Sequence, residues 1–155
     1  MALSKNQRYI VFGIVIVLVA GVTVTTAYSL HLFDTTGRSG PPCPSSPASY
    51  SSSSNYTIII TNQGFNASKT YAQPCPVLNV RRGQTVTIHL ENIDQVETHG
   101  FAITHYLDNQ GAVQLGPGQT KDIVFSATQT GSFLIYCIVP CSIHPYMQDG
   151  RLNVT

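Results

Sequence analysis

The most informative segment of this chain is GSFLIYCIVPCSIHPYMQDGRLNV, residues 131–154. Its two ends, SFLIYC (132–137) and RLNV (151–154), are rich in β-branched and aromatic residues, a composition typical of β-strands. The residues between them contain two prolines and fall where a loop would join the two strands. The side chains of that loop include two thiols, an imidazole and a thioether. The stretch therefore predicts two strands joined by a loop of reactive and metal-binding side chains.

The four side chains are those of Cys137, Cys141, His144 and Met147, and together they suit copper. Soft sulfur ligands combined with imidazole select copper over the other common protein metals. Zinc is the first rival, but closed zinc sites use Cys and His, and a thioether is a poor ligand for Zn²⁺. A disulfide between the two cysteines is the second rival. That disulfide would leave the histidine, the methionine and the upstream His99 unexplained.

Five further segments have the composition of strands. They are YTIIIT (56–61), VLNV (77–80), TVTIHLE (85–91), FAITH (101–105) and DIVFSA (122–127). Turns rich in Gly and Pro separate them, and none shows a helical period of 3.6 residues. In TVTIHLE the alternation puts Val86, Ile88 and Leu90 on one face and His89 on the polar, solvated face. The pattern predicts an all-β fold, a small sandwich or barrel.

The N-terminal region holds a candidate membrane span at residues 9–33. No Asp, Glu, Lys or Arg occurs between Arg8 and Asp34, and a helix of this length would reach roughly 37 Å, against a hydrocarbon core of about 30 Å. The positive-inside rule places residues 1–8 in the cytoplasm and the C-terminal domain outside. A cleaved signal peptide is the alternative, but the apolar run exceeds the usual h-region. We therefore expect a single-pass protein of the cell membrane.

A linker is expected over residues 34–55 and a globular domain over residues 56–155. Gly, Pro and Ser make up 14 of the 19 residues from 37 to 55, too polar a composition to fold alone.

Cys43 and Cys75 lie in Pro-flanked segments, and an exported location permits a disulfide between them. Three sequons, each a weak signal for glycosylation, begin at Asn55, Asn66 and Asn153.

Charge and length exclude two broad classes of function. The chain has 8 Lys and Arg against 7 Asp and Glu, a formal net charge of +1, so it offers no basic field for nucleic acid. Its 155 residues suffice for about one domain and an accessory segment, which excludes a large multidomain enzyme.

The motifs from His99 onward resemble the CuA domain of subunit II of haem-copper terminal oxidases. They are His-Gly-Phe, a Pro-Gly turn in LGPGQT, Gly-x-Phe-x-x-x-Cys-x-x-x-Cys and His-x-x-Met. With the N-terminal segment, the resemblance covers most of the chain except the linker. The chain is similar to the short type with a single transmembrane helix, as in archaeal SoxM-like oxidases. The resemblance implies a cupredoxin fold, a Greek-key β-sandwich, in agreement with the strand prediction.

The resemblance also implies a binuclear copper site and its ligands. The implied ligands are His99, Cys137, Val139, Cys141, His144 and Met147. The two cysteines would be bridging thiolates, and each histidine would bind one copper. The methionine thioether and the valine backbone carbonyl would be weak ligands. Such a subunit accepts electrons from an external cytochrome c or blue copper protein and passes them to haem in subunit I, where oxygen is reduced.

One spacing departs from this family. CuA domains have three residues between the second Cys and the His, whereas only Ser142 and Ile143 intervene here. The segment CSIHPYM (141–147) is similar to the Cys-x-x-His-Pro-x-Met loop of amicyanin-like blue copper proteins, which hold one copper with one thiolate. A membrane-anchored, mononuclear carrier of the amicyanin or sulfocyanin kind is therefore an alternative. A metal-free structural subunit II of a quinol oxidase is another, and the complete donor set argues against it.

The residues around His99 give two further expectations. His105, six residues later on the predicted strand, is expected on the polar surface or beside the site, without being a ligand. The preceding carboxylates Glu91, Asp94 and Glu97 would form either an acidic docking surface for a cationic electron donor or an ordinary solvated loop.

Overall fold

The computed structural model of the chain describes residues 40–46, 52–108 and 111–155. The predicted cytoplasmic segment 1–8 and membrane span 9–33 lie outside these residues. Within the described ranges, no helix has the length and apolar character that a membrane crossing requires.

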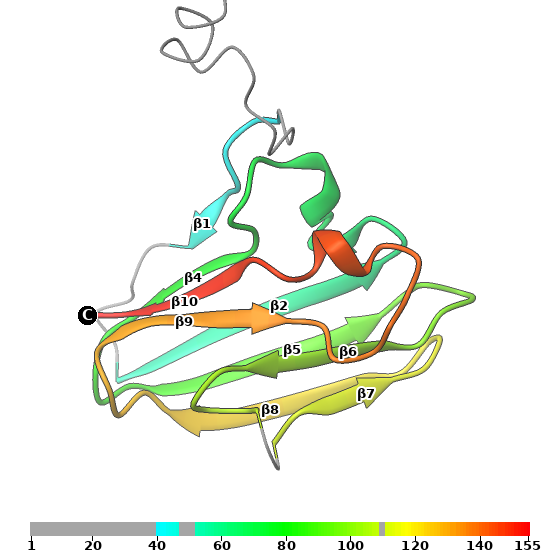
Figure 1. The fold of residues 1–155 in the computed structure, drawn as a ribbon. Helices are drawn as coiled ribbons and strands as arrows, with labels where there is room; N and C mark the ends of the chain where they lie inside the picture. The colour runs from blue at the N-terminus through cyan, green and yellow to red at the C-terminus, as the bar shows by residue number, and fades with distance from the viewer. Residues whose placement is uncertain (1–39, 47–51, 109–110) are drawn as a thin grey trace, which may run out of the picture. The chain divides into compact units, whose positions relative to one another are not determined.

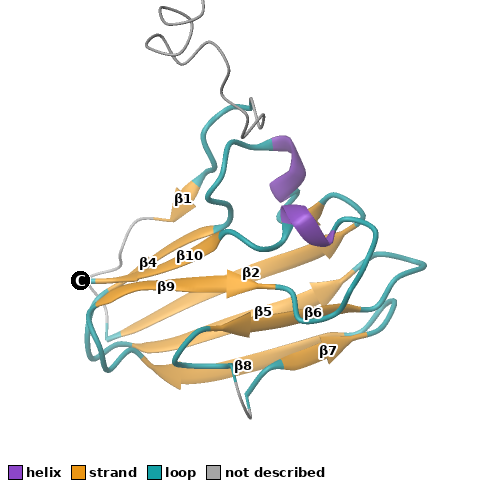
Figure 2. Ribbon diagram, viewed as in Figure 1, coloured by secondary structure: helices purple, strands orange, loops and turns teal. Residues whose placement is uncertain are grey.

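Short strands account for the regular structure of the described residues, with two 3₁₀ turns (Figure 2). In chain order the elements are β1 (Ser45–Ser46), β2 (Ser53–Thr61), β3 (Gly64–Phe65), η1 (Ser68–Thr70), β4 (Val77–Val80), β5 (Thr85–Asn92), β6 (His99–Ile103), β7 (Val113–Leu115), β8 (Thr120–Ser126), β9 (Gly131–Tyr136), η2 (His144–Tyr146) and β10 (Gly150–Val154). They form two sheets, ordered β1-β4-β10-β9-β6-β7 and β3-β2-β5-β8 (Figure 1). The prediction of an all-β sandwich is confirmed.

Alternating side chains build the core between the two sheets. On β5 the predicted alternation is confirmed, because Val86, Ile88 and Leu90 are fully buried while the residues between them are partly exposed. His89 lies on the outer face, where its Nδ1 is 2.6 Å from Oδ1 of Asp122 on β8. Burial of one face per strand drives the two sheets together and leaves the outer faces polar.

All seven predicted strands are present, with shifts of a few residues at their ends. The start of β2 moves most, from residue 56 to Ser53. β6 is shifted at both ends, and it begins at His99 because His99 and Gly100 pair with Leu115 and Gln114 of β7. β6 ends at Ile103, since His105 adopts a left-handed φ of 72° in the turn that follows. Three strands were not predicted, β1, β3 and β7, and each has only two or three residues, too few to show a period.

The folded unit begins before the predicted boundary at residue 56. β2 starts at Ser53, and β1, within the expected linker, pairs in parallel with the first residues of β4. A disulfide joins Cys43 to Cys75, with the two Cα atoms 5.4 Å apart. Strand pairing uses backbone groups, so a segment without apolar side chains can still pair once a covalent bond holds it against the sheet.

The three sequon asparagines lie in different surroundings. Asn55 is exposed on β2. The Oδ1 atom of Asn66 accepts a hydrogen bond from the amide of Ile59 (2.8 Å). Asn153 on β10 donates from Nδ2 to Asn79 (2.9 Å), so its amide is engaged within the sheet.

Candidate metal centre

Sheet topology brings the predicted ligands to one end of the sandwich. β9 and β6 are antiparallel neighbours, with Tyr136 opposite Ala102, so the chain leaves β9 beside the beginning of β6. Cys137 is the first residue after β9, and His99 is the first residue of β6. The loop from β9 to β10, which carries η2, therefore lies over the start of β6 (Figure 1). The backbone amide of Cys137 closes this loop by donating to the carbonyl of Met147 (2.8 Å).

A cluster of three side chains lies at the centre of the site. One imidazole nitrogen of His99 and the two Sγ atoms of Cys137 and Cys141 all lie within 4.8 Å of one another. Both cysteines are free thiols, so the structure contradicts the disulfide rival. His99 and Cys137 are buried, and Cys141 is half-buried. Two thiols and an imidazole so placed can bind one or more soft metal ions.

His99 is oriented by a carboxylate. Its Nε2 lies 3.0 Å from Oδ2 of Asp94, which is itself buried. Although burial opposes ionisation, hydrogen bonds from His99 and from the amides of Val96 and Glu97 lower the pKa of Asp94 below its ordinary value. An ionised Asp94 accepts the hydrogen bond from Nε2, so Nδ1 is the nitrogen that could offer a lone pair to a metal ion.

Nδ1 of His99 is an orphaned polar atom. It is buried, and it has no hydrogen-bond partner among the described residues. Buried polar atoms are nearly always satisfied, so an exception calls for an explanation. The two thiols beside this atom supply one, because the site as a whole fits a metal ion that the nitrogen would bind. This observation tests the donor set independently of the sequence motif.

The other three predicted ligands border this cluster. The carbonyl oxygen of Val139 lies 3.1 Å from Sγ of Cys137 and 3.0 Å from Nδ1 of His144. The Sδ atom of Met147 lies 3.9 Å from Sγ of Cys141. The six atoms thus form a continuous chain of near neighbours, although His144 is outside the 4.8 Å cluster. His105, by contrast, is exposed and stacks on Phe133, with ring centroids 5.5 Å apart.

The thiol of Cys141 is protonated in the metal-free site. Burial, followed by the charge of Cys137, raises the pKa of Cys141 to about 12. Thiolates are the form that binds metal, so metal binding would displace this proton. The sulfur of Cys137 also accepts a hydrogen bond, which the backbone amide of Gly100 donates to its Sγ atom (3.2 Å). Such a contact stabilises negative charge on the sulfur.

Replacing Gly100 by Ala is expected to destabilise the domain by about 2 kcal/mol, the usual range for overpacking a buried position. An added Cβ would collide with the Ile138 side chain and would lie 2.8 Å from the Ile138 amide nitrogen. Urea unfolding of the metal-free chain measures the effect. The matched control is Gly116→Ala, whose Cβ would meet its nearest atom, Oε1 of Gln119, at 3.4 Å. Equal stability of the two variants would contradict the close approach of β6 to the ligand loop.

Met147 rests on the segment around η1. The hydroxyl of Ser68, which is fully buried, donates to the carbonyl of Tyr146 (2.6 Å). Gly64 has a φ of +93° and packs against Ser68, and a Cβ there would also lie 3.4 Å from Cγ of Met147. Glycine is needed because other residues rarely adopt this conformation. The segment from β3 to η1 thereby packs against the part of the ligand loop that carries Tyr146 and Met147.

Two of the three carboxylates that precede His99 are held by hydrogen bonds, whether the loop is a docking surface or an ordinary solvated loop. Asp94 is buried against His99, and Glu97 accepts hydrogen bonds from the amide and hydroxyl of Ser142, at 3.0 and 2.6 Å. Those bonds lower the pKa of Glu97 below its ordinary value. Asp94 and Glu97 are therefore engaged within the domain, and a docking surface for an electron donor stays a prediction. These contacts are not visible in the sequence, because a charged loop is usually solvated and no local pattern identifies a partner 45 residues away.

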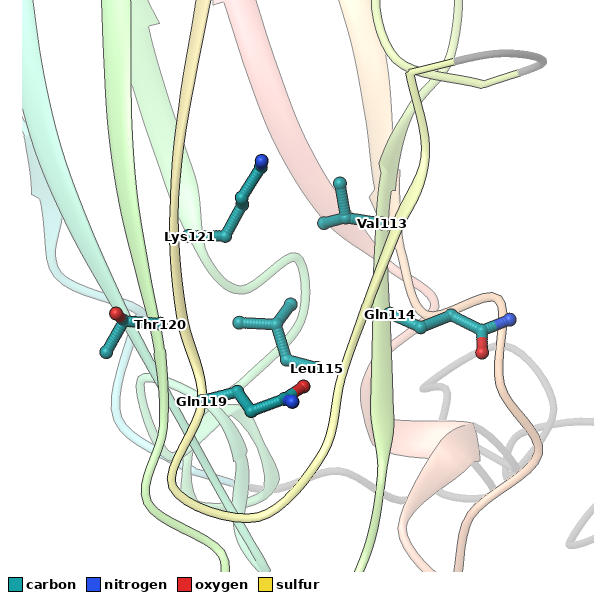
Figure 3. Close-up of a pocket in the computed structure, with 6 residues that line it drawn as sticks. All are labelled: Val113, Gln114, Leu115, Gln119, Thr120 and Lys121. Carbon is teal, nitrogen blue, oxygen red and sulfur yellow. The ribbon is translucent and has the colours of Figure 1, made fainter.

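A groove elsewhere in the fold contains none of the predicted ligands. Its volume is about 460 Å³, and it lies between β7 and β8, the edge strands of the two sheets. Figure 3 shows Leu115 pointing into this groove and Gln114 pointing away from it. The candidate centre is thus a compact cluster of side chains under a loop, separate from this groove.

Comparison with known proteins finds relatives for part of the chain. No protein-family model matches it. Nitrous-oxide reductase from Pseudomonas fluorescens is 37% identical over 78 residues, and that from Stutzerimonas stutzeri is 35% identical over 78 residues. Each match covers 48% of this chain and only 12% of the relative.

Solved structures show the same fold. Reduced auracyanin from Roseiflexus castenholzii has a TM-score of 0.50 at 18% identity, covering 65% of this chain and 96% of that protein. Copper nitrite reductase from Nitrosomonas europaea has a TM-score of 0.52 at 22% identity, covering 66% of this chain and 41% of that one. A multicopper oxidase has a TM-score of 0.53 at 22% identity, with 66% and 42% covered. The described β-sandwich is cupredoxin-like, and part of the chain is related in sequence to part of nitrous-oxide reductase.

Proposed function

We propose that this chain is a copper electron-transfer protein with a binuclear CuA site, serving as subunit II of a haem-copper terminal oxidase. One observation carries the proposal: a buried, unpartnered imidazole nitrogen of His99 lies with two free thiols at one end of a cupredoxin-like sandwich. The thioether of Met147 beside Cys141 adds a ligand that suits copper better than zinc.

Two copper ions account for both thiols. Cys137 and Cys141 belong to the same cluster, and each is within 4.8 Å of the His99 nitrogen. A mononuclear site built on Cys141 would leave the buried thiol of Cys137 beside the metal without a role. The ligand count therefore favours the binuclear site, which the resemblance to CuA domains also implies.

The fold of this chain would keep the predicted ligands in fixed positions. Bound copper would supply the one-electron couple. The surrounding core excludes water from His99, Cys137 and Met147. Pro140 and Pro145 restrict the conformations of the residues before them, which stiffens the loop. A site that is rigid before and after electron transfer reorganises little, and this favours fast transfer.

The wider assignment extends this proposal to the cell membrane. Residues 9–33 would anchor the chain, with residues 1–8 in the cytoplasm and the cupredoxin-like domain outside. The external donor would be a cytochrome c or a blue copper protein. Haem in subunit I would receive the electrons and reduce oxygen, so this chain would have no substrate turnover of its own.

A mononuclear blue copper carrier is the second candidate. The observation in its favour is the turn from Cys141 to His144, in which two residues separate the ligands and the His144 amide donates to the Cys141 carbonyl (3.1 Å). This is the spacing of amicyanin-like loops. In that case His99, one cysteine, His144 and Met147 would bind a single ion.

Copper analysis combined with EPR separates the candidates. The full chain, purified in detergent and loaded with copper, is expected to bind two ions and to give hyperfine structure shared between two nuclei. One ion per chain with single-nucleus hyperfine structure would replace the proposal with the mononuclear carrier. Failure to bind copper, or preference for Zn²⁺ in competition, would overturn both.

A further inference from the structure

The short spacer in the ligand loop forms a tight turn. The amide of His144 donates to the carbonyl of Cys141 (3.1 Å), so the two predicted ligands are the first and last residues of that turn. Ile143, in the middle, is buried in the core. Ser142 is exposed, and its amide points outward from the turn to a partner in another loop. A contact that fixes Ser142 therefore also affects the positions of Cys141 and His144, the two predicted ligands of the turn.

Glu97 holds Ser142 with both carboxylate oxygens. Oε1 accepts from the Ser142 amide (3.0 Å), and Oε2 accepts from the Ser142 hydroxyl (2.6 Å). Two bonds from one planar group fix orientation as well as distance, and bonds to an ionised acceptor are stronger than neutral ones. Glu97 lies two residues before His99, so this pair joins the segment that leads into β6 to the loop that carries the other predicted ligands.

The backbone of Glu97 is itself anchored. Its amide donates to Oδ1 of Asp94 (3.2 Å), and its carbonyl accepts from Nδ2 of Asn92 (3.0 Å). Asn92 is fully buried and also donates to the carbonyl of Leu115 (2.9 Å). A carboxylate on a segment held in this way is a fixed support for Ser142.

The carboxylates are satisfied by this network, which argues against a separate cation site. Asp94, Glu97 and His99 have ligand atoms within 4.8 Å of one another, an arrangement that could in principle hold a cation. However, Oδ2 of Asp94 is engaged by His99, and its Oδ1 by the amides of Val96 and Glu97. Both oxygens of Glu97 face Ser142. The cluster is therefore a support for the neighbouring centre.

We propose that Glu97 is a positioning residue that sets the place of the Cys141–His144 turn relative to His99, and with it the geometry and reduction potential of the metal centre. The metal part of this inference rests on the proposed function, whereas the clamp itself does not. Without the clamp the turn is free to move away from His99, which loosens the ligand set. Loss of a full negative charge beside the centre also favours the reduced form.

The clamp is tested first in the metal-free chain, by NMR hydrogen exchange of the Ser142 amide in detergent micelles. In Glu97→Ala this amide is expected to exchange at least about tenfold faster, because it loses its acceptor and becomes solvated. Ser142→Ala keeps the amide bond and should change the rate less. Glu91→Gln, which removes a charge from β5, is the matched control and should leave the rate unchanged. An unchanged rate in Glu97→Ala would overturn the clamp.

The copper-loaded chain tests the consequence for the centre. Supporting residues next to metal ligands typically change metal affinity by about 10- to 100-fold, and we expect copper release to a chelator to speed up in that range in Glu97→Ala. The midpoint potential should rise in both Glu97→Ala and Glu97→Gln, with a smaller increase in release rate for the latter. Adding Ser142→Ala to Glu97→Ala should have no further effect, since the two residues act as one unit.

The outcomes distinguish this inference from the proposed function. Release and potential unchanged in Glu97→Ala, or additive effects of the two substitutions, would overturn the positioning role. If the wild-type chain binds no copper, the proposed function fails. The exchange of the Ser142 amide would then still decide whether Glu97 clamps the turn.

Discussion

The two-copper EPR signal is expected to disappear when Cys137 is replaced by Ser. The serine oxygen is a hard donor that stays protonated at neutral pH, so it cannot replace a shared thiolate. Copper bound per chain should fall from two ions to one or none, and any remaining hyperfine structure should come from one nucleus. Elemental analysis and EPR of the full chain measure both effects. Cys141→Ser should have the same consequence, because both thiols belong to one cluster.

The comparison of the two cysteine variants is the sharpest test of nuclearity. If the site is mononuclear and built on Cys141, Cys137→Ser will keep its copper and its spectrum, and only Cys141→Ser will lose them. His89→Ala is the matched control, because this histidine lies on the outer face of β5, paired with Asp122. It should leave copper content and spectrum unchanged. A change there would mean that copper binds at surface histidines.

Removal of the disulfide is expected to lower the free energy of unfolding by about 3–4 kcal/mol in the chain-entropy model. Cys43 and Cys75 are separated by 32 residues, and opening that loop gives the unfolded chain many more conformations. The variant Cys43→Ala leaves the buried side chain of Cys75 in place, so it isolates the effect of the bond from that of the core. Urea unfolding of the oxidised full chain measures the difference.

Two controls accompany the disulfide experiment. A reducing agent should destabilise the wild type by a similar amount and should leave Cys43→Ala unaffected. The double variant with Cys75→Ala should lose somewhat more than the single one, because Cys75 is fully buried and its sulfur fills core volume. Equal stability of wild type and Cys43→Ala would contradict a stabilising role for the bond.

The strands were predictable because their signal is local. The alternation on β5 can be seen in seven consecutive residues, and burial of Val86, Ile88 and Leu90 follows from it. β1, β3 and β7 could not be found in this way, since two or three residues contain no period. The start of the domain was misplaced for a related reason. The amino-acid composition of a segment predicts whether its side chains can be buried. Residues 45–46 join the sheet through backbone pairing to β4, which composition does not predict.

The sequence predicted which side chains would gather at the proposed site, but it did not predict the contacts that support them. Cys137, Cys141, His144 and Met147 lie within eleven residues, so their proximity follows from the loop that contains them. The contribution of His99 required the resemblance to a known family. Asp94 and Glu97 stand out in the sequence as charged residues near His99. Their hydrogen-bond partners depend on which side of their loop faces the rest of the domain. Only the packed structure determines that.

Local sequence pattern is sufficient for the seven longer strands and for the set of donor atoms in the proposed metal site, because strand period and ligand type can be seen in nearby residues. Tertiary packing brings an unpartnered nitrogen of His99 to two free thiols and places Glu97 against the turn between two predicted ligands. These contacts join residues about 40 positions apart. They exist because antiparallel pairing of β6 with β9 brings two distant loops to the same end of the sheet.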